Sequence, residues 1–282
     1  MVDEVQRIQS PNLQKRQIPG YCDYHTEESF NTYIERNKLL TNRGITLFSH
    51  NVRSLPRHDH EIKLLLSNLS INFDIIGLCE TWITDGNKDL YGFNGYHTPV
   101  QSIRNNRRGG GVALYLKKDL EFVVRSDLNF NNEFSESVFV EIDKSIYNTE
   151  KNIIIGTIYR VPNSDLDIFN KDLALILMKV NKEGKLFYLM GDTNIDLLKS
   201  SDHSLTSEFL DLMYSHNMFP LITKPTRVTN DSATLIDNIF TNNLKNSVKH
   251  HQGIIYNDIS DHFPVFHMNE EFSLKQVNSK YT

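Results

Sequence analysis

The stretch YLMGDTNID, residues 188–196, decides how the rest of this chain is interpreted. It is a hydrophobic strand pattern that ends in Gly191 and then places Asp192, Asn194 and Asp196 close together. Asp and Asn are disfavoured inside strands, whereas the carboxyl end of a strand is where α/β proteins place their chemistry. Because Gly, Asp and Asn also form ordinary turns, the stretch alone leaves a plain turn and a catalytic loop open.

The composition rules out several classes of protein. The chain has 282 residues, of which 39% are hydrophobic, so it can bury a core, and its net charge of −5 argues against coating nucleic acid through bulk electrostatics. Cys22 and Cys79 form no CxxC pair, which excludes a disulfide framework and fits a reducing compartment, either nuclear or cytoplasmic. Because there is no membrane-length apolar run and no secretory signal, we expect an intracellular protein without membrane contact.

The texture of the sequence changes near residue 44. Residues 1–43 are polar, and we expect a partly disordered N-terminal tail or linker with one short helix over residues 28–40. Residues 44–270 mix apolar strands with amphipathic helices and form the expected catalytic domain, which residues 271–282 follow as a C-terminal tail. Since several successive strands lack an intervening helix, the pattern favours an α/β fold of two packed sheets with helices on the outer faces.

The expected elements can be placed from their periodicity. Strands are predicted at 45–49, 73–79, 111–116, 137–142, 152–159, 186–190, 234–240 and 264–268, and helices at 59–70, 164–180 and 205–214. In the longest helix the apolar residues share one face, and Ser164 is the candidate N-cap.

Polar side chains that can bind a metal or carry a proton lie at or near the ends of these strands. They are Asn51, Glu80, Tyr159, Asp192, Asn194, Asp237, Asp261 and His262. Any one of them alone could be a cap, a turn residue or a satisfied buried group. Converging at one rim, they suit the hydrolysis of a phosphate ester.

Each candidate has a chemical reason. A hard divalent cation takes oxygen ligands, which Glu80, Asn51 and Asp261 can supply.

Proton handling falls to the other candidates. Asp192 can deprotonate or orient a water, and the amide of Asn194 can hold either partner. His262, kept charged and oriented by Asp237, can donate to a phosphoryl oxygen, and Tyr159 can do likewise or steady the leaving oxygen.

The familiar nucleophile and nucleotide motifs are absent. The chain contains no GxSxG, no P-loop and no GxGxxG. The glycine run RGGGVAL (108–114) lacks the spacing of a phosphate cradle, and we interpret it as a tight turn into a strand.

The motifs carry a family resemblance. LFSHNVRSL, DIIGLCETW, TIYRVPN, LMGDTNID, SATLIDNIF and ISDHFPVF follow one another as in the endonuclease/exonuclease/phosphatase superfamily, over residues 44–268. CETW, RRGGGVALYL and SATLIDNIFTN make the chain most similar to the apurinic-type endonuclease domain of non-LTR (LINE-type) retrotransposons.

The resemblance implies a fold and an activity. The expected fold is a four-layered α/β sandwich, two packed mixed β-sheets flanked by helices. The expected activity is Mg²⁺-dependent nicking of DNA, with Mn²⁺ as another usable cation. In such elements the nick leaves a 3′-hydroxyl that primes reverse transcription, so a reverse-transcriptase domain of the same element is the expected partner.

Residue roles follow from the matching motifs. By this resemblance, Asn51 and Glu80 match the family's metal-site residues, and Tyr159 matches its active-site tyrosine. Asp192 and Asn194 match the pair that activates and orients water, and Asp237 matches the acid that orients the histidine. Asp261 and His262 match the closing pair of the family's motifs. The chain departs from abasic-site repair enzymes of the superfamily at Arg53, where they carry an acid. One extra residue after Tyr159 also puts Asn163 in doubt as a substrate contact.

DNA contacts are expected from local basic residues. Arg104, Arg107 and Arg108 share one loop, and Lys224 and Arg227 come just before the strand that carries the histidine-orienting acid. A solvated loop is the ordinary alternative for such charges.

Two other functions remain open at this point. The chain could be a phosphoesterase of the same superfamily for a phospholipid or RNA, or a catalytically silent nucleic-acid-binding domain. The second is disfavoured because each main catalytic position holds the expected type of residue. The lone Trp82 is expected to pack beside the site, and Asp196 to act as a turn or helix-start residue.

Overall fold

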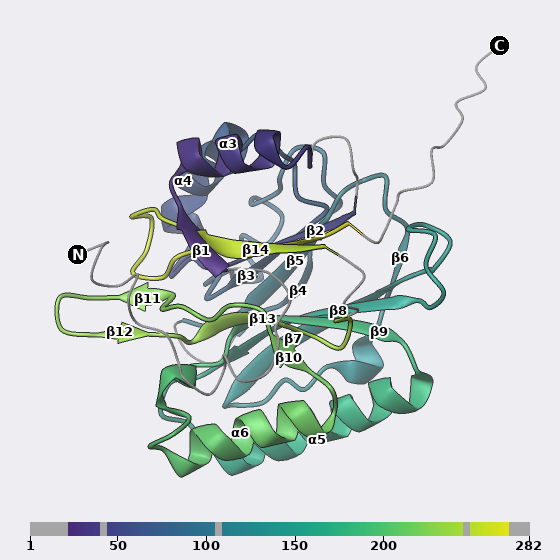
Figure 1. Ribbon diagram of the computed structural model, residues 1–282, viewed down its shortest axis with the longest axis vertical. Coiled ribbons are helices and arrows are strands. Elements are labelled where there is room, and N and C mark those ends of the chain that lie inside the picture. Colours follow the sequence, from purple (N-terminus) through teal and green to yellow (C-terminus); the bar gives the residue numbers. More distant parts are fainter. Residues whose placement is uncertain (1–21, 40–43, 105–108, 245–248, 271–282) are drawn as a thin grey trace.

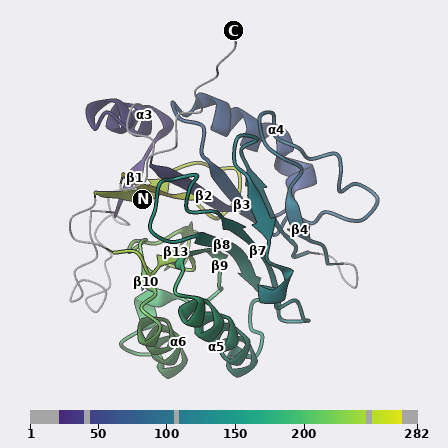
Figure 2. The same ribbon diagram turned by 90° about the vertical axis from the view of Figure 1, so that its right-hand side faces the viewer.

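The computed structural model describes residues 22–39, 44–104, 109–244 and 249–270. Two β-sheets pack face to face, and a pair of helices covers each outer face (Figure 1). Figure 2 shows the same four layers from the side, with α3 and α4 over one sheet and α5 and α6 over the other. The helices are α3 (Glu27–Arg36), α4 (Leu55–Asn68), α5 (Leu166–Glu183) and α6 (Ser204–Ser215). The predicted four-layered α/β sandwich is confirmed.

The larger sheet has seven strands in the order β1–β14–β15–β2–β3–β5–β4. Its strands are β1 (Cys22–His25), β14 (His250–Ile255), β15 (Val265–Asn269), β2 (Ile45–Asn51), β3 (Ile75–Cys79), β5 (Val112–Leu116) and β4 (Val100–Ser102). Two late strands, β14 and β15, therefore lie between the early strands β1 and β2.

The second sheet has six strands in the order β10–β13–β9–β8–β7–β6. They are β10 (Phe219–Pro220), β13 (Asp237–Thr241), β9 (Leu186–Asp192), β8 (Ile153–Arg160), β7 (Ser135–Ile142) and β6 (Phe122–Val124). A ribbon of β11 (Arg227–Val228) and β12 (Ala233–Thr234) projects from the sandwich (Figure 1). Short 3₁₀ helices lie at η1 (Ser126–Leu128) and η2 (Leu197–Lys199).

The hydrophobic runs form these strands because both faces of each sheet are covered. Every residue of β8 is buried, as expected for a strand packed on two sides. One apolar cluster fills the space between the sheets and beneath α5 and α6, and a second lies between the larger sheet and α3 and α4. All the predicted strands and helices overlap observed elements.

The strand directions bring the candidate residues to one edge of the sandwich. β2 and β3 run parallel with Asn51 opposite Cys79, and β8 and β9 run parallel with Tyr159 opposite Asp192. β13 runs antiparallel to β9, so its first residue, Asp237, also faces Asp192. Carboxyl ends of parallel strands thus meet amino ends of antiparallel neighbours at a single rim.

The N-terminal region differs from the expectation. We expected residues 1–43 to be a tail, but β1 pairs in parallel with β14, and α3 follows it from a capping box at Thr26. Residues 22–36 thus belong to the fold, and only the short helix in this region was anticipated. β1 was missed because its partner lies more than 200 residues away and leaves no local pattern. Residues 1–21, 40–43 and 271–282 lie outside the described part of the chain.

Two local predictions about caps have different outcomes. Asp165, and not Ser164, caps α5, since its carboxylate accepts from the N–H groups of Asp167 and Ile168. Ser164 instead accepts a hydrogen bond from Arg160 at 2.8 Å. The expectation for Asp196 is confirmed, because it caps η2.

Two further findings concern the cysteines and the lengths of the helices. Cys22 and Cys79 are both buried free thiols. Within the described ranges, no helix combines the length and hydropathy needed to cross a bilayer.

A pair of buried histidines lies on β14 and β15 of the larger sheet. The rings of His250 and His267 stack with centroids 5.5 Å apart, and neither nitrogen of His267 has a hydrogen-bond partner among the described residues. Burial, together with the neighbouring His250 and His251, holds the pKa of His267 well below its ordinary value. His267 is therefore neutral in the folded protein.

We predict that this histidine makes the fold sensitive to acid. Above the ordinary pKa of 6.5 the ring is neutral in both states, but below it only the unfolded chain takes up the proton, so stability falls as pH falls. In His267→Phe the free energy of unfolding should depend less on pH, with a slope smaller by up to about 1.4 kcal/mol per pH unit below the ordinary pKa. Urea unfolding between about pH 7.5 and about pH 5 measures this slope.

The matched control is His60→Phe, on the exposed face of α4, which should keep the wild-type pH dependence. An acid dependence that is the same in His267→Phe and wild type would contradict the assignment.

Candidate active site

Asp192 is the centre of the site. Its side chain is fully buried at the carboxyl end of β9. Oδ2 accepts hydrogen bonds from Asn51 Nδ2 at 2.7 Å and Asn194 Nδ2 at 3.3 Å, and Oδ1 accepts from the backbone N–H of Asn194 at 2.8 Å. The two side-chain amides therefore fix the orientation of the carboxylate.

Glu80 lies next to Asp192 and is held from both sides. Asn51 Nδ2 also donates to Glu80 Oε1 at 2.8 Å, and Trp82 Nε1 donates to Oε2 at 3.2 Å. Asn51 was predicted to offer an oxygen to a metal, but its Oδ1 accepts from Arg53 N, and its amide nitrogen bridges the two carboxylates. Asn51 thus acts as a hydrogen-bond donor to two neighbouring carboxylates, those of Glu80 and Asp192.

His262 completes the centre from the other side. Its Nδ1 lies 2.9 Å from Asp237 Oδ2, and that oxygen also accepts from Thr226 Oγ1 at 2.8 Å. Burial opposes a charged ring, but the nearby carboxylates, led by Asp237, outweigh it and raise the pKa of His262 to about 9. The histidine is therefore a cation whose Nε2–H can serve a substrate oxygen.

The electrostatics of the centre favour an added cation. Burial and the charge of Asp237 raise the pKa of Asp192 to about 7, although the charge of His262 and the hydrogen bonds from Asn194 and Asn51 lower it.

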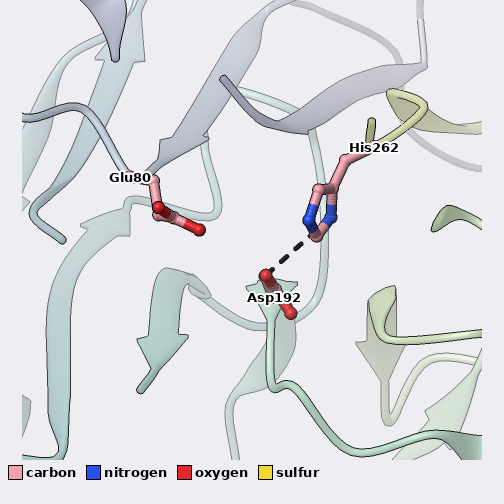
Figure 3. A group of neighbouring side chains, drawn as sticks. All are labelled: Glu80, Asp192 and His262. Carbon is pink, nitrogen blue, oxygen red and sulfur yellow. Dashed lines mark ion pairs between the residues drawn. The ribbon is translucent and has the colours of Figure 1, made fainter. Parts of the chain in front are cut away.

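Ligand atoms of Glu80, Asp192 and His262 lie within 4.8 Å of one another, and their side chains converge in Figure 3. The carboxylate oxygens fit a hard divalent cation such as Mg²⁺.

Tyr159 lies beside Asp192 at the end of β8, under a wall formed by an ion pair. Burial, and then the charges of Glu80 and Asp192, raise the pKa of Tyr159, so its phenol keeps its proton. The guanidinium of Arg104 lies 5.8 Å from the Tyr159 ring centroid and pairs with Glu136. The protonated phenol of Tyr159 can therefore act as a hydrogen-bond donor beside Asp192.

Strained backbone is concentrated at this site. Glu80, Trp82 and Asn194 have positive φ values of 50°, 53° and 50°. Such conformations cost about 1 kcal/mol or more each and occur where the surrounding structure enforces them. Gly191 has φ of 133°, and a Cβ there would lie 2.0 Å from the carbonyl oxygen of Ile158, so only glycine can precede Asp192.

The glycine run 109–111 supports the loop that follows Glu80. The N–H groups of Thr81 and Trp82 donate to the carbonyls of Gly111 and Gly110, at 3.2 and 3.0 Å. A Cβ at Gly111 would lie 2.7 Å from Thr81 Oγ1. The run does lead into β5, as predicted, and it also fixes the loop that carries Glu80.

Several supporting residues were missed by sequence reasoning. Arg160 donates to the carbonyls of Thr193 and Asn194 at 2.8 and 3.1 Å and so holds the loop after Asp192. Ser260 Oγ donates to the carbonyl of Asn51 at 2.8 Å. The sequence offered only one signal for each: Arg160 follows Tyr159, and Ser260 is the first residue of the SDH motif. Their contacts could not be predicted, because long-range hydrogen bonds to backbone carbonyls leave no pattern in the sequence.

Asp261 does not join the centre. It was predicted as a metal ligand, but Oδ1 accepts from Arg53 Nη1 at 2.8 Å and Oδ2 accepts from Arg227 Nε at 2.7 Å. Both oxygens therefore serve arginines, which sequence spacing could not show.

The residues predicted to bind DNA have different positions. Lys224 is buried and pairs with Asp23 of β1 at 2.7 Å, so it attaches the N-terminal strand and is unavailable to DNA. Arg104 is largely buried by its pair with Glu136. Arg227 stays partly exposed on β11. Arg107 and Arg108 lie outside the described residues.

Comparisons with known proteins were consistent with this geometry. The model of the Endonuclease/Exonuclease/phosphatase family matches residues 48–262. No curated protein sequence matches the chain.

Three solved structures illustrate the shared fold. The endonuclease domain of TRAS1, a telomere-specific non-LTR retrotransposon, has a TM-score of 0.60 at 16% identity, covering 80% of this chain and 98% of that one. The Xenopus laevis APE2 catalytic domain has a TM-score of 0.60 at 16% identity, with 80% and 92% covered. A 3′-5′ exonuclease (NExo) from Neisseria meningitidis has a TM-score of 0.59 at 15% identity, with 79% and 98% covered. At these identities the likeness shows the fold alone.

We predict that the convergent carboxylates bind Mn²⁺ or Mg²⁺ and that the cation stabilises the fold. Saturation at about 100 times Kd should add about 2.7 kcal/mol, seen as a higher Tm in thermal unfolding. Glu80→Gln should remove most of this shift, whereas Glu150→Gln, an exposed carboxylate elsewhere, should keep it. Equal shifts in both variants would place the cation away from Glu80.

We further predict that Trp82 positions Glu80 for the cation. Trp82→Phe keeps the ring but removes the N–H that donates to Oε2. Groups that orient metal ligands typically contribute 10- to 100-fold in affinity, so calorimetry should show Mn²⁺ binding weakened by about 10-fold. Wild-type affinity in this variant would assign Trp82 to packing only.

Proposed function

The chain belongs to the Endonuclease/Exonuclease/phosphatase family, and we propose that it is a metal-dependent phosphodiesterase that nicks DNA and leaves a 3′-hydroxyl. One observation carries the proposal: the fully buried Asp192 lies between Glu80 and a His262 that Asp237 keeps charged. A base, a cation-binding acid and a cationic donor therefore face the same small space. Together these three groups can activate a water and stabilise the negative charge that develops during phosphodiester hydrolysis.

The residues divide the reaction between them. Asp192, held by Asn51 and Asn194, takes the proton of a water whose oxygen forms the new bond to phosphorus. The bond from phosphorus to the 3′-oxygen breaks, the 3′-oxygen leaves as a hydroxyl with a proton from the Tyr159 phenol or from water, and a 5′-phosphate remains. The Nε2–H of His262 donates to a phosphoryl oxygen as negative charge collects there.

A divalent cation would be held by Glu80 and would neutralise charge on the phosphoryl oxygens. The two neutral donors on Glu80 leave lone pairs on both of its oxygens for such an ion. Mg²⁺ is the proposed ion, with Mn²⁺ able to replace it, because the atoms that would bind the ion are carboxylate oxygens.

The proposed setting is target-primed retrotransposition. The motif order and the CETW, RRGGGVALYL and SATLIDNIFTN segments support it. The similarity in fold to the TRAS1 endonuclease domain is consistent with it. A reverse-transcriptase domain of the same element is the proposed partner, because it would extend the 3′-hydroxyl that the nick exposes.

The test is conversion of supercoiled plasmid to open circles with Mg²⁺. We expect wild type to nick, a chelator to stop nicking, and Asp192→Asn and His262→Gln to lower the rate by about 10²-fold or more, since each removes a group that acts in the transition state. Lys63→Gln, on the outer face of α4, is the control and should nick as wild type does.

Two results would contradict the proposal. His262→Gln at the wild-type rate would remove the histidine from the reaction. Inert DNA together with hydrolysis of a phospholipid or RNA would assign the site to another substrate.

A further inference from the structure

A bridge of three charged residues lies beside the catalytic histidine and has no part in the reaction described above. Asp261 accepts from Arg53 Nη1 at 2.8 Å through one oxygen and from Arg227 Nε at 2.7 Å through the other. The arginines come from the loop after β2 and from the β11 ribbon, which are far apart in the sequence. One carboxylate therefore holds two guanidinium groups together at the rim of the site.

The bridge is tied to the site through the backbone. Asp261 directly precedes His262, and Arg227 forms an isolated β-bridge with His262. The N–H of Arg53 donates to Asn51 Oδ1, the amide that also contacts Asp192. Both guanidinium groups are therefore fixed relative to the reacting groups, and a ligand bound to them would have a defined position.

The guanidinium groups keep donors for a ligand. The side chains of Arg53 and Arg227 are 47% and 34% exposed, and each uses one nitrogen on Asp261. The described residues offer no acceptor to their other N–H groups. A guanidinium presents five N–H donors in a fixed fork, which suits a phosphate.

The negative charge of the site would repel a phosphate unless positive charge lay nearby. Glu80, Asp192 and Asp237 place three acids around the reacting position, against one cation at His262. The whole chain has a net charge of −5. Two arginines against one Asp261 leave the bridge with an excess positive charge beside the acids, where a polyanion must approach.

We propose that Arg53 and Arg227, held by Asp261, form a binding site for a DNA backbone phosphate next to the one that is cleaved. This inference rests on the proposed function and adds the contact that seats the strand. Asp261 acts as a positioning residue, because it orders two flexible side chains before the phosphate arrives and so lowers the entropic cost of binding. It also explains why the carboxylate predicted to bind metal is occupied by arginines.

The test measures binding of a short DNA duplex without cleavage, in chelator, as a function of salt. Each phosphate contact contributes about 0.9 to the slope of log K against log salt, so Arg53→Gln and Arg227→Gln should each lower the slope by about one and weaken binding several-fold. Lys63→Gln removes the same charge from α4 and should leave both quantities unchanged. Arg53→Lys should keep the slope but bind more weakly, because the fork is lost.

In nicking assays the arginine variants should raise KM while kcat stays within about 2-fold of wild type, as expected for a contact that binds substrate and transition state equally. Wild-type affinity and salt slope in both glutamine variants would overturn the phosphate site and leave the proposed function intact. A loss confined to an RNA duplex of the same sequence would overturn the assignment to DNA. Because binding is measured without turnover, failure of wild type to nick would count only against the proposed function.

Discussion

The arrangement of the rest of the site depends on the burial of one carboxylate, Asp192. A charged group removed from water needs donors around it, and two asparagine side chains and one backbone N–H supply them. Burial and the charge of Asp237 raise its pKa, and a carboxylate with a higher pKa is a stronger base. The strained backbone at Glu80, Trp82 and Asn194 is the cost of directing these groups at one point.

The sandwich architecture explains how residues so far apart in the chain come together. Parallel pairs of strands in each sheet end at the same rim, and antiparallel neighbours begin there. Side chains from β2 and β9, in different sheets, then meet directly across the interface, as Asn51 and Asp192 do. The hydrophobic core between the sheets fixes this distance, so packing and chemistry are coupled.

Much of this arrangement could be predicted from the sequence, for a physical reason. Strands buried on both faces are continuous apolar runs, and polar residues at their ends stand out. Long-range polar contacts are not visible in this way. Lys224 looked like a DNA contact and instead attaches β1, Asp261 looked like a ligand and instead bridges arginines, and β14 was missed because it begins with two histidines and a glutamine.

The interleaving of early and late strands in the larger sheet has a consequence for biosynthesis. β1 pairs with β14, and β2 pairs with β15, so the sheet stays open until about the last strand has left the ribosome. Asn51 and Glu80 are made early, whereas His262 arrives just before β15. A growing chain thus lacks the His262 cation until just before β15 is made, so the candidate site is completed at about the point where the larger sheet can close.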